Sequence, residues 1–76
     1  MGSQNLSQTR CEALFASALQ RSEAPTADSV TEAITRALRQ FGAGGCAGRV
    51  AQEFGDHPEM ARDRMLWARQ LLEEAA

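Results

Sequence analysis

The sequence predicts an all-α protein, and three observations support this prediction. Apolar residues recur at spacings of three and four along most of the chain, as they do on one face of an α-helix. Ala and Leu supply most of the apolar content, and both lose little conformational entropy in a helix. No stretch alternates apolar and polar residues as a half-buried β-strand would. We therefore expect one compact four-helix domain over residues 1–76, with disorder at residues 1–6.

The first predicted helix covers about Ser7 to Gln20. Its apolar face consists of Cys11, Leu14, Phe15, Ala18 and Leu19. Pro25 prevents any continuation, because proline lacks the amide hydrogen that a helix interior needs.

The second predicted helix ends at Phe41, just before a glycine-rich segment. Three residues can cap its start, namely Thr26, Asp28 or Ser29. Ser29 and Glu32 also have the spacing of a capping box. Gly42 to Gly45 is expected to break the chain, since glycine readily adopts the left-handed conformations that end a helix.

The third and fourth predicted helices follow this break. The third is short and ends at Gly55. The residues predicted on its inward face are Ala47, Val50, Ala51 and Phe54. The fourth runs from Pro58 to about Glu73, and proline suits the first position of a helix. We expect a core that buries together Phe15, Leu38, Phe54 and Met65.

The charge and the cysteines argue against several functional classes. The net charge is −2, every basic residue is arginine, and the C-terminal half holds the whole negative balance. An acidic balance argues against anionic membrane surfaces and non-specific nucleic-acid binding. Cys11 and Cys46 lack a C-x-x-C partner and a nearby histidine, so we expect buried thiols rather than a metal or redox site. A cytoplasmic protein is expected, because no signal-peptide pattern or membrane-spanning stretch is present.

No combination of residues predicts an enzyme. We find no nucleophile–base pair, paired carboxylates or metal-ligand cluster, so no catalytic residue, cofactor or small-molecule substrate is expected. His57 stands beside Asp56 at a predicted helix start, where a cap is more usual than an acid–base role. Asp28-Ser29-Val30 resembles the Asp-Ser-Leu motif of acyl carrier proteins, in which the serine carries phosphopantetheine. The preceding loop is shorter than in that family, and such a serine is most often a cap.

The last two predicted helices have the spacing of a helix-turn-helix motif. Such a motif needs a small residue in its first helix, a glycine in the turn and apolar residues in the second helix. A three-residue connection precedes Glu59. The residues that meet these needs are Ala51, Gly55, Ala61 and Met65.

Residues 47–70 resemble the DNA-binding helix-turn-helix of sigma factor region 4. In that family an Ala-x-x-x-Gly first helix and turn leads to a second helix with Arg-apolar-x-x-Ala-Arg near its end. The matching residues are Ala51, Gly55, Arg64-Met65 and Ala68-Arg69. Ala61 replaces the usual Ile or Val, and the Leu-Pro-x-x-x-Arg lead-in is absent. The whole chain also resembles, less specifically, short actinobacterial proteins of unassigned function.

The resemblance implies a small DNA-binding regulatory protein. Arg62 and Glu59 would then contact bases, while the phosphate contacts would come from Arg49, Arg64 and Arg69. A homodimer is expected in this case, because one recognition helix buries too little surface for tight specific binding.

The alternative is a non-enzymatic protein–protein interaction module or adaptor that presents the C-terminal helix. Glu59 and Asp63 beside the single guanidinium of Arg62 make a poor phosphate-facing surface, which favours this alternative. The expected contacts with a protein partner are Met60, Leu66 and Trp67.

Overall fold

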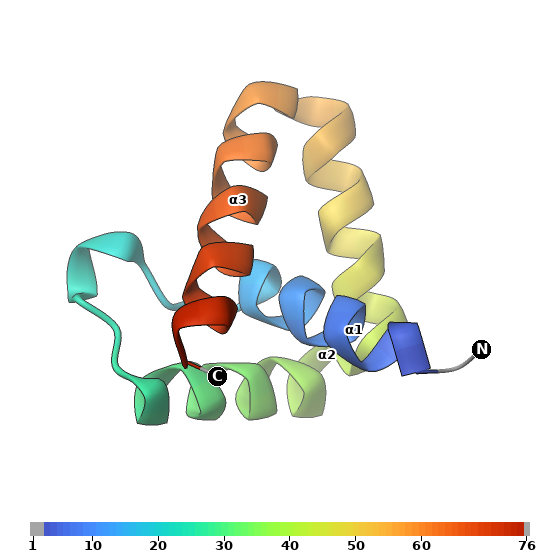
Figure 1. Cartoon of the computed structure of the whole chain (residues 1–76). Coiled ribbons are helices and arrows are strands. Elements are labelled where there is room, and N and C mark those ends of the chain that lie inside the picture. The colour runs from blue at the N-terminus through green and yellow to red at the C-terminus, as the bar shows by residue number, and fades with distance from the viewer. Residues whose placement is uncertain (1–2, 76) are drawn as a thin grey trace.

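The computed structural model describes residues 3–75, with side chains for residues 7–74, and this part of the chain is helical almost throughout (Figure 1). Three α-helices follow one another, with a short 3-10 helix between the first two. Their bounds are Ser3–Ala16 for α1, Arg21–Glu23 for η1, Ala27–Asp56 for α2 and Pro58–Ala75 for α3. The all-α prediction is confirmed, whereas the predicted count of four helices is wrong.

The bounds of α1 differ from the predicted ones at both ends. Residues 3–6, part of the segment expected to be disordered, form its first turn, and residues 1–2 lie outside the described part. The helix also stops short of its predicted end at Gln20. Ser17 follows the last turn, and its hydroxyl donates a hydrogen bond to the carbonyl oxygen of Leu14 at 2.6 Å. This side chain competes with continuation of the helix.

The start of α2 is capped by Thr26. The amide of Ser29 donates to Oγ1 of Thr26 at 3.2 Å, and the amide of Thr26 donates to Oγ of Ser29 at 2.8 Å. The two residues therefore form the capping box, instead of the predicted pair of Ser29 with Glu32. The Ser29 hydroxyl also donates to the carbonyl oxygen of Thr26 at 2.9 Å, so its hydrogen bonds are those of a cap.

The second and third predicted helices form one helix with a kink at Gly42. The backbone there has φ 72° and ψ 167°, a combination open almost only to glycine. The rest of the glycine-rich segment is helical, so the chain turns at one residue instead of breaking over four. Figure 1 shows the two arms of α2, residues 27–41 and 43–56, pointing in different directions.

Two contacts brace the kink in α2. The guanidinium of Arg49 lies 3.8 Å from the centroid of the Phe41 ring, which joins the two arms through a cation–π contact. Gly45 lies so near that an added Cβ would be 3.1 Å from the Cβ of Phe41. A small residue at position 45 therefore lets the second arm approach the first.

A single residue, His57, separates α2 from α3, instead of the predicted three-residue connection. Its amide donates to the carbonyl oxygen of Glu53 at 2.7 Å, and its own carbonyl accepts from the amide of Ala61 at 2.9 Å. Pro58 begins α3 as predicted. Residues 43–75 thus form a helical hairpin that projects away from α1 (Figure 1).

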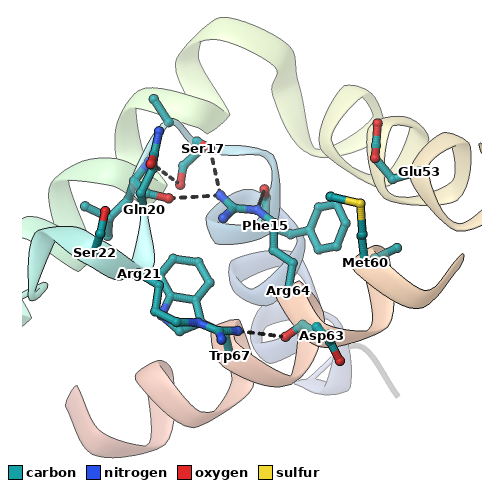
Figure 2. Close-up of a pocket in the computed structure, with 13 residues that line it drawn as sticks. Phe15, Ser17, Gln20, Arg21, Ser22, Glu53, Met60, Asp63, Arg64 and Trp67 are labelled. Atoms are coloured by element: carbon teal, nitrogen blue, oxygen red, sulfur yellow. Dashed lines mark hydrogen bonds between the residues drawn. The ribbon is translucent and has the colours of Figure 1, made fainter. Parts of the chain in front are cut away.

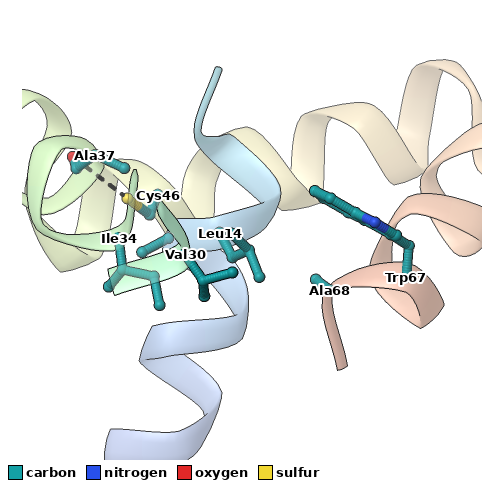
Figure 3. Packing of buried hydrophobic residues seen from close by; sticks show 8 residues of the cluster. Leu14, Val30, Ile34, Ala37, Cys46, Trp67 and Ala68 are labelled. Carbon is teal, nitrogen blue, oxygen red and sulfur yellow. Dashed lines mark hydrogen bonds between the residues drawn. The ribbon is translucent and has the colours of Figure 1, made fainter. Parts of the chain in front are cut away.

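The core lies where all three helices meet (Figure 3). Its largest fully buried side chains are Leu14, Val30 and Cys46. The rest of the buried cluster consists of Ala13, Ile34, Ala37, Trp67 and Ala68. Cys46 was correctly expected to be buried, whereas Cys11 is half-buried, and both are free thiols. Among the described residues, no helix is both long enough and apolar enough to span a membrane.

The far end of the hairpin is more open than the sequence predicts. Of the four residues expected to share a core, Phe15 is buried, Leu38 and Met65 are half-buried, and 39% of Phe54 is exposed. Residues 51–60 are all exposed, Ala51 among them. The reason is geometric, because α1 crosses the base of the hairpin and leaves its projecting end uncovered (Figure 1).

Candidate functional site

The five residues predicted to contact DNA are not gathered on one surface. Arg49 belongs to α2, where its guanidinium stacks on the ring of Phe41. Arg64 lies half-buried on the side of α3 that faces α1. The exposed members on α3 are Glu59, Arg62 and Arg69. Their spacing places these three on the outer side of α3, away from Arg64.

Arg64 is bound to the C-terminal end of α1 (Figure 2). Its guanidinium donates from Nε to the carbonyl oxygen of Phe15 at 2.7 Å. From Nη2 it donates to the carbonyl oxygens of Leu14 at 3.4 Å, Ser17 at 3.0 Å and Leu19 at 3.0 Å. The last carbonyl groups of a helix lack partners inside it, so Arg64 supplies both donors and positive charge at the negative end of the dipole.

Burial lowers the pKa of Arg64 below its ordinary value, and the nearby charge of Arg21 lowers it further. Arginine nevertheless stays protonated at any ordinary pH, so the cap on α1 keeps its charge. The guanidinium also lies 4.8 Å from the centroid of the Trp67 ring. Trp67 belongs to α3 as Arg64 does, so this contact lies within one helix. Arg64 holds α3 against α1 through its hydrogen bonds and through a cation–π contact with Phe15, whose ring centroid lies 5.8 Å from the guanidinium.

The three residues predicted to contact a protein partner lie in different environments. Met60 is 71% exposed and Leu66 is 53% exposed, whereas Trp67 is only 8% exposed and belongs to the core. A separation of six residues turns Leu66 about 120° from Met60 around the helix axis. Leu66 therefore lies on the outer side of α3, and the three residues form no common surface.

A groove of about 840 Å³ runs between the end of α1, the following connection and the first half of α3. Its buried and half-buried lining includes Phe15, Leu19, Ala61, Arg64 and Trp67. The exposed lining includes Gln20, Arg21, Ser22, Glu53, Met60 and Asp63. The groove thus has a mainly apolar floor that also contains the guanidinium of Arg64, and a polar rim. This composition suits binding of an apolar group held by a few polar contacts.

The two ends of the groove differ in chemistry (Figure 2). Glu53 and Met60 lie at the end formed by the hairpin, while Gln20 and Arg21 lie at the end formed by the connection. Arg21 donates from Nη2 to the backbone carbonyl oxygen of Asp63 at 3.4 Å. This bond crosses the groove and ties the connection to α3.

Phe54 extends the apolar surface at the hairpin end. Its ring stacks on that of Phe15, with centroids 6.3 Å apart and planes at 20°. Phe15 is buried in the groove floor, while Phe54 remains 39% exposed. Phe54 and Met60 are two of the three large apolar residues exposed within the described part of the chain, Leu66 being the third.

The described residues contain no group of three or more His, Cys, Asp or Glu side chains that could hold a metal ion. His57 lies with Nδ1 at 3.4 Å from Oε1 of Glu53, an ion pair only while the histidine is protonated. Both side chains are exposed.

Sequence reasoning found Met60 but missed most of the groove. The sequence predicts that Phe15 and Leu19 share the apolar face of the first helix, and it gives no role to Arg21 or Glu53. One signal for Phe54 was present. It lies next to Gly55 near a predicted helix end, where few neighbours are available to cover a large ring.

Comparison with known proteins gives no relative for this chain. No protein-family model, curated protein or solved structure matches it.

Proposed function

We propose that this protein is a non-enzymatic protein-binding module whose partner occupies the groove between α1 and α3. The observation that carries the proposal is the exposure of Met60 and Phe54 at the hairpin end of an apolar groove. Contiguous exposed apolar residues with a polar rim are typical of protein–protein interaction sites. Methionine suits such a surface because its flexible, polarisable side chain adapts to different partners.

Of the three residues that the sequence predicts to contact a protein partner, only Met60 is both exposed and part of the groove. Trp67 supports the groove floor from within the core, while Leu66 faces away from the groove. Phe54 takes their place, because it stacks on Phe15 and presents an exposed ring. The contact surface therefore includes both arms of the hairpin rather than the C-terminal helix alone.

DNA binding stays a hypothesis based on sequence, with less support than protein binding. The donors of Arg64 engage the end of α1, and Arg49 stacks on Phe41. Arg62 and Arg69 remain on the outer face of α3, where they share the surface with acidic residues. Two such arginines neutralise few phosphates, so the electrostatic attraction that drives DNA binding is small.

Photo-crosslinking tests the proposal. A photoreactive residue is placed at position 60, and the same residue at position 66 is the matched control. Both positions are exposed on α3, but only Met60 lines the groove. We expect one cellular protein to be crosslinked from position 60 and not from position 66. The purified partner should then bind the unlabelled protein, and Met60→Ser should weaken binding by about tenfold or more.

Two outcomes contradict the proposal. The first is a crosslinked protein that shows no affinity for the purified chain. The second is tight binding to duplex DNA at low salt, where electrostatic attraction is strongest, with loss of affinity in Arg62→Ala and Arg69→Ala. The second outcome would support the helix-turn-helix hypothesis instead.

A further inference from the structure

The change of direction in α2 depends on the backbone of one residue. Gly42 has φ 72° and ψ 167°, whereas both arms of α2 on either side of it are helical. Glycine also adopts helical dihedral angles, so rotation at Gly42 alone would join the two arms into one straight helix. A Cβ added at Gly42 or Gly44 would meet no described atom within 4 Å, so open space surrounds the kink. The geometry at Gly42 is therefore that of a hinge.

The buried cluster takes its residues from both sides of this hinge (Figure 3). Leu14 and Val30 come from residues 3–41, and Cys46 and Trp67 come from residues 43–75. In a single chain, a straight α2 would separate these two groups and expose them to water, which is unfavourable. A straight α2 is thus stable only where a second copy of the chain covers both exposed faces.

The side-chain contacts across the kink can re-form between two copies. The guanidinium of Arg49 lies 3.8 Å from the centroid of the Phe41 ring, and the Cys46 thiol donates to the carbonyl oxygen of Ala37 at 3.7 Å. Neither contact requires that both residues belong to the same chain. An exchange of hairpins therefore keeps the packing and changes the backbone at the hinge.

We propose that α2 straightens at Gly42 and that two copies of the chain then exchange their hairpins, residues 43–75. Each hairpin packs on residues 3–41 of the other copy, as in other domain-swapped dimers. The proposal does not rest on the function proposed above. The groove keeps its lining, but Phe15 comes from one copy and Met60 from the other. Because the contacts are the same in both forms, protein concentration decides the balance between monomer and dimer.

The chirality of residue 42 gives a sharp test. Gly42→Ala introduces L-alanine, which disfavours the dihedral angles of the kink and favours a straight helix. D-alanine in place of Gly42 has mirror-image preferences and therefore suits a positive φ. The two chains have the same composition and differ only in the hand of one methyl group. Chemical synthesis can supply both, because ligation at the natural Cys46 joins residues 1–45 to residues 46–76.

Sedimentation equilibrium at several protein concentrations measures self-association. We expect Gly42→Ala to dimerise at least about a hundredfold more tightly than the natural chain, since each dimer relieves the strain of two kinks. The chain with D-alanine in place of Gly42 should associate no more tightly than the natural one. Gly48→Ala is the matched control and should not change the association constant, because position 48 is helical in both forms.

Isotope-filtered NMR distinguishes exchange of hairpins from association of two intact monomers. Equal amounts of labelled and unlabelled Gly42→Ala are unfolded together and refolded. In an exchanged dimer, nuclear Overhauser effects between the Trp67 ring and the methyl groups of Leu14 and Val30 arise between chains. In a dimer of intact monomers they arise within one chain. We expect the effects between chains, because these residues share the buried cluster.

Three results would overturn the proposal. The first is a folded Gly42→Ala that stays monomeric at about 1 mM, where mass action favours association. The second is a dimer whose Trp67 contacts stay within one chain, and the third is equal association of the L-alanine and D-alanine chains. If Gly42→Ala does not fold, the natural chain decides. Refolded from urea at about 1 mM, it should contain exchanged dimer with contacts between chains, and monomer alone would reject the hinge.

Discussion

The Nε atom of Arg64 donates a hydrogen bond to the carbonyl oxygen of Phe15 at 2.7 Å, across 49 positions of the sequence. Arg64 belongs to α3 and Phe15 to the last turn of α1. The same guanidinium donates to the carbonyl oxygen of Leu14 in α1 and to those of Ser17 and Leu19 in the connection that follows. One side chain therefore both completes the hydrogen bonding of α1 and fixes the wall of the groove.

Arg64→Lys should lower the free energy of unfolding by about 2 kcal/mol. Lysine keeps the charge but lacks the planar fork of donors, and each hydrogen bond to a charged group contributes about 1.5–3 kcal/mol. Urea denaturation followed by circular dichroism measures the loss. The exposed Arg62→Lys is the matched control and should change stability by less than about 0.5 kcal/mol. An equally small loss for Arg64→Lys would mean that water replaces these bonds without cost.

Gly42→Ala should destabilise the protein, because only glycine readily adopts φ 72° with ψ 167°. We expect a loss of about 1–3 kcal/mol, the cost of a residue held in a sparsely populated backbone region. Gly48→Ala is the control, since Gly48 is helical and a Cβ there meets no atom within 4 Å. That change should raise stability by up to about 1 kcal/mol. Equal effects of the two changes in thermal unfolding would argue against the kink.

Phe54→Ala should cost only about 1–2 kcal/mol, although truncation of a fully buried aromatic costs about 3–5 kcal/mol. The reason is that 39% of Phe54 is exposed and its main aromatic contact is with Phe15. Leu14→Ala removes a fully buried side chain and should cost about 2–5 kcal/mol in the same urea titration. A larger loss for Phe54→Ala than for Leu14→Ala would place Phe54 in the core.

The stability of the protein should fall as the pH rises above 9.0. Burial raises the pKa of the Cys11 and Cys46 thiols above their ordinary value of 9.0. The unfolded chain then loses these protons before the folded one, so the stabilisation is complete below the ordinary pKa and is lost through the raised one. The chain has no lysine or tyrosine, so few other groups titrate there.

The double variant Cys11→Ala/Cys46→Ala should keep a nearly constant free energy of unfolding between about pH 8 and pH 10. Urea denaturation at several pH values measures how the free energy of unfolding changes with pH. This slope does not depend on the loss of packing that both substitutions cause. A slope as steep as that of the natural chain would show that other groups are responsible.

The fold class follows from the sequence because the periodicity of apolar residues sets helices locally. The stripe that includes Leu14 and Phe15 lies in α1, and Pro58 begins α3 as expected. The helix count does not follow in the same way. A single residue, Gly42, turns α2 without breaking it, and a run of glycines does not reveal which member takes the left-handed conformation.

The groove could be predicted only in part, because its residues meet through tertiary contacts. Met60 is among the residues that the sequence predicts to contact a protein partner, and it lines the groove. Arg64 was assigned to phosphate because nothing in the sequence places it beside the carbonyl groups of α1. Phe54 is expected in the core because periodicity gives the apolar face of a helix but not which part of that face a neighbouring helix covers.

The connection between α2 and α3 has a thermodynamic consequence for recognition. With His57 alone between the two helices, the hairpin end of the groove contains almost no non-helical chain. A ligand that settles between Phe54 and Met60 would have little backbone to order. The protein's own ordering cost at this end is therefore confined mainly to a few rotamers, such as those of the methionine, and adds little to the translational and rotational entropy that every association loses. A modest apolar contact area could suffice for a reversible complex.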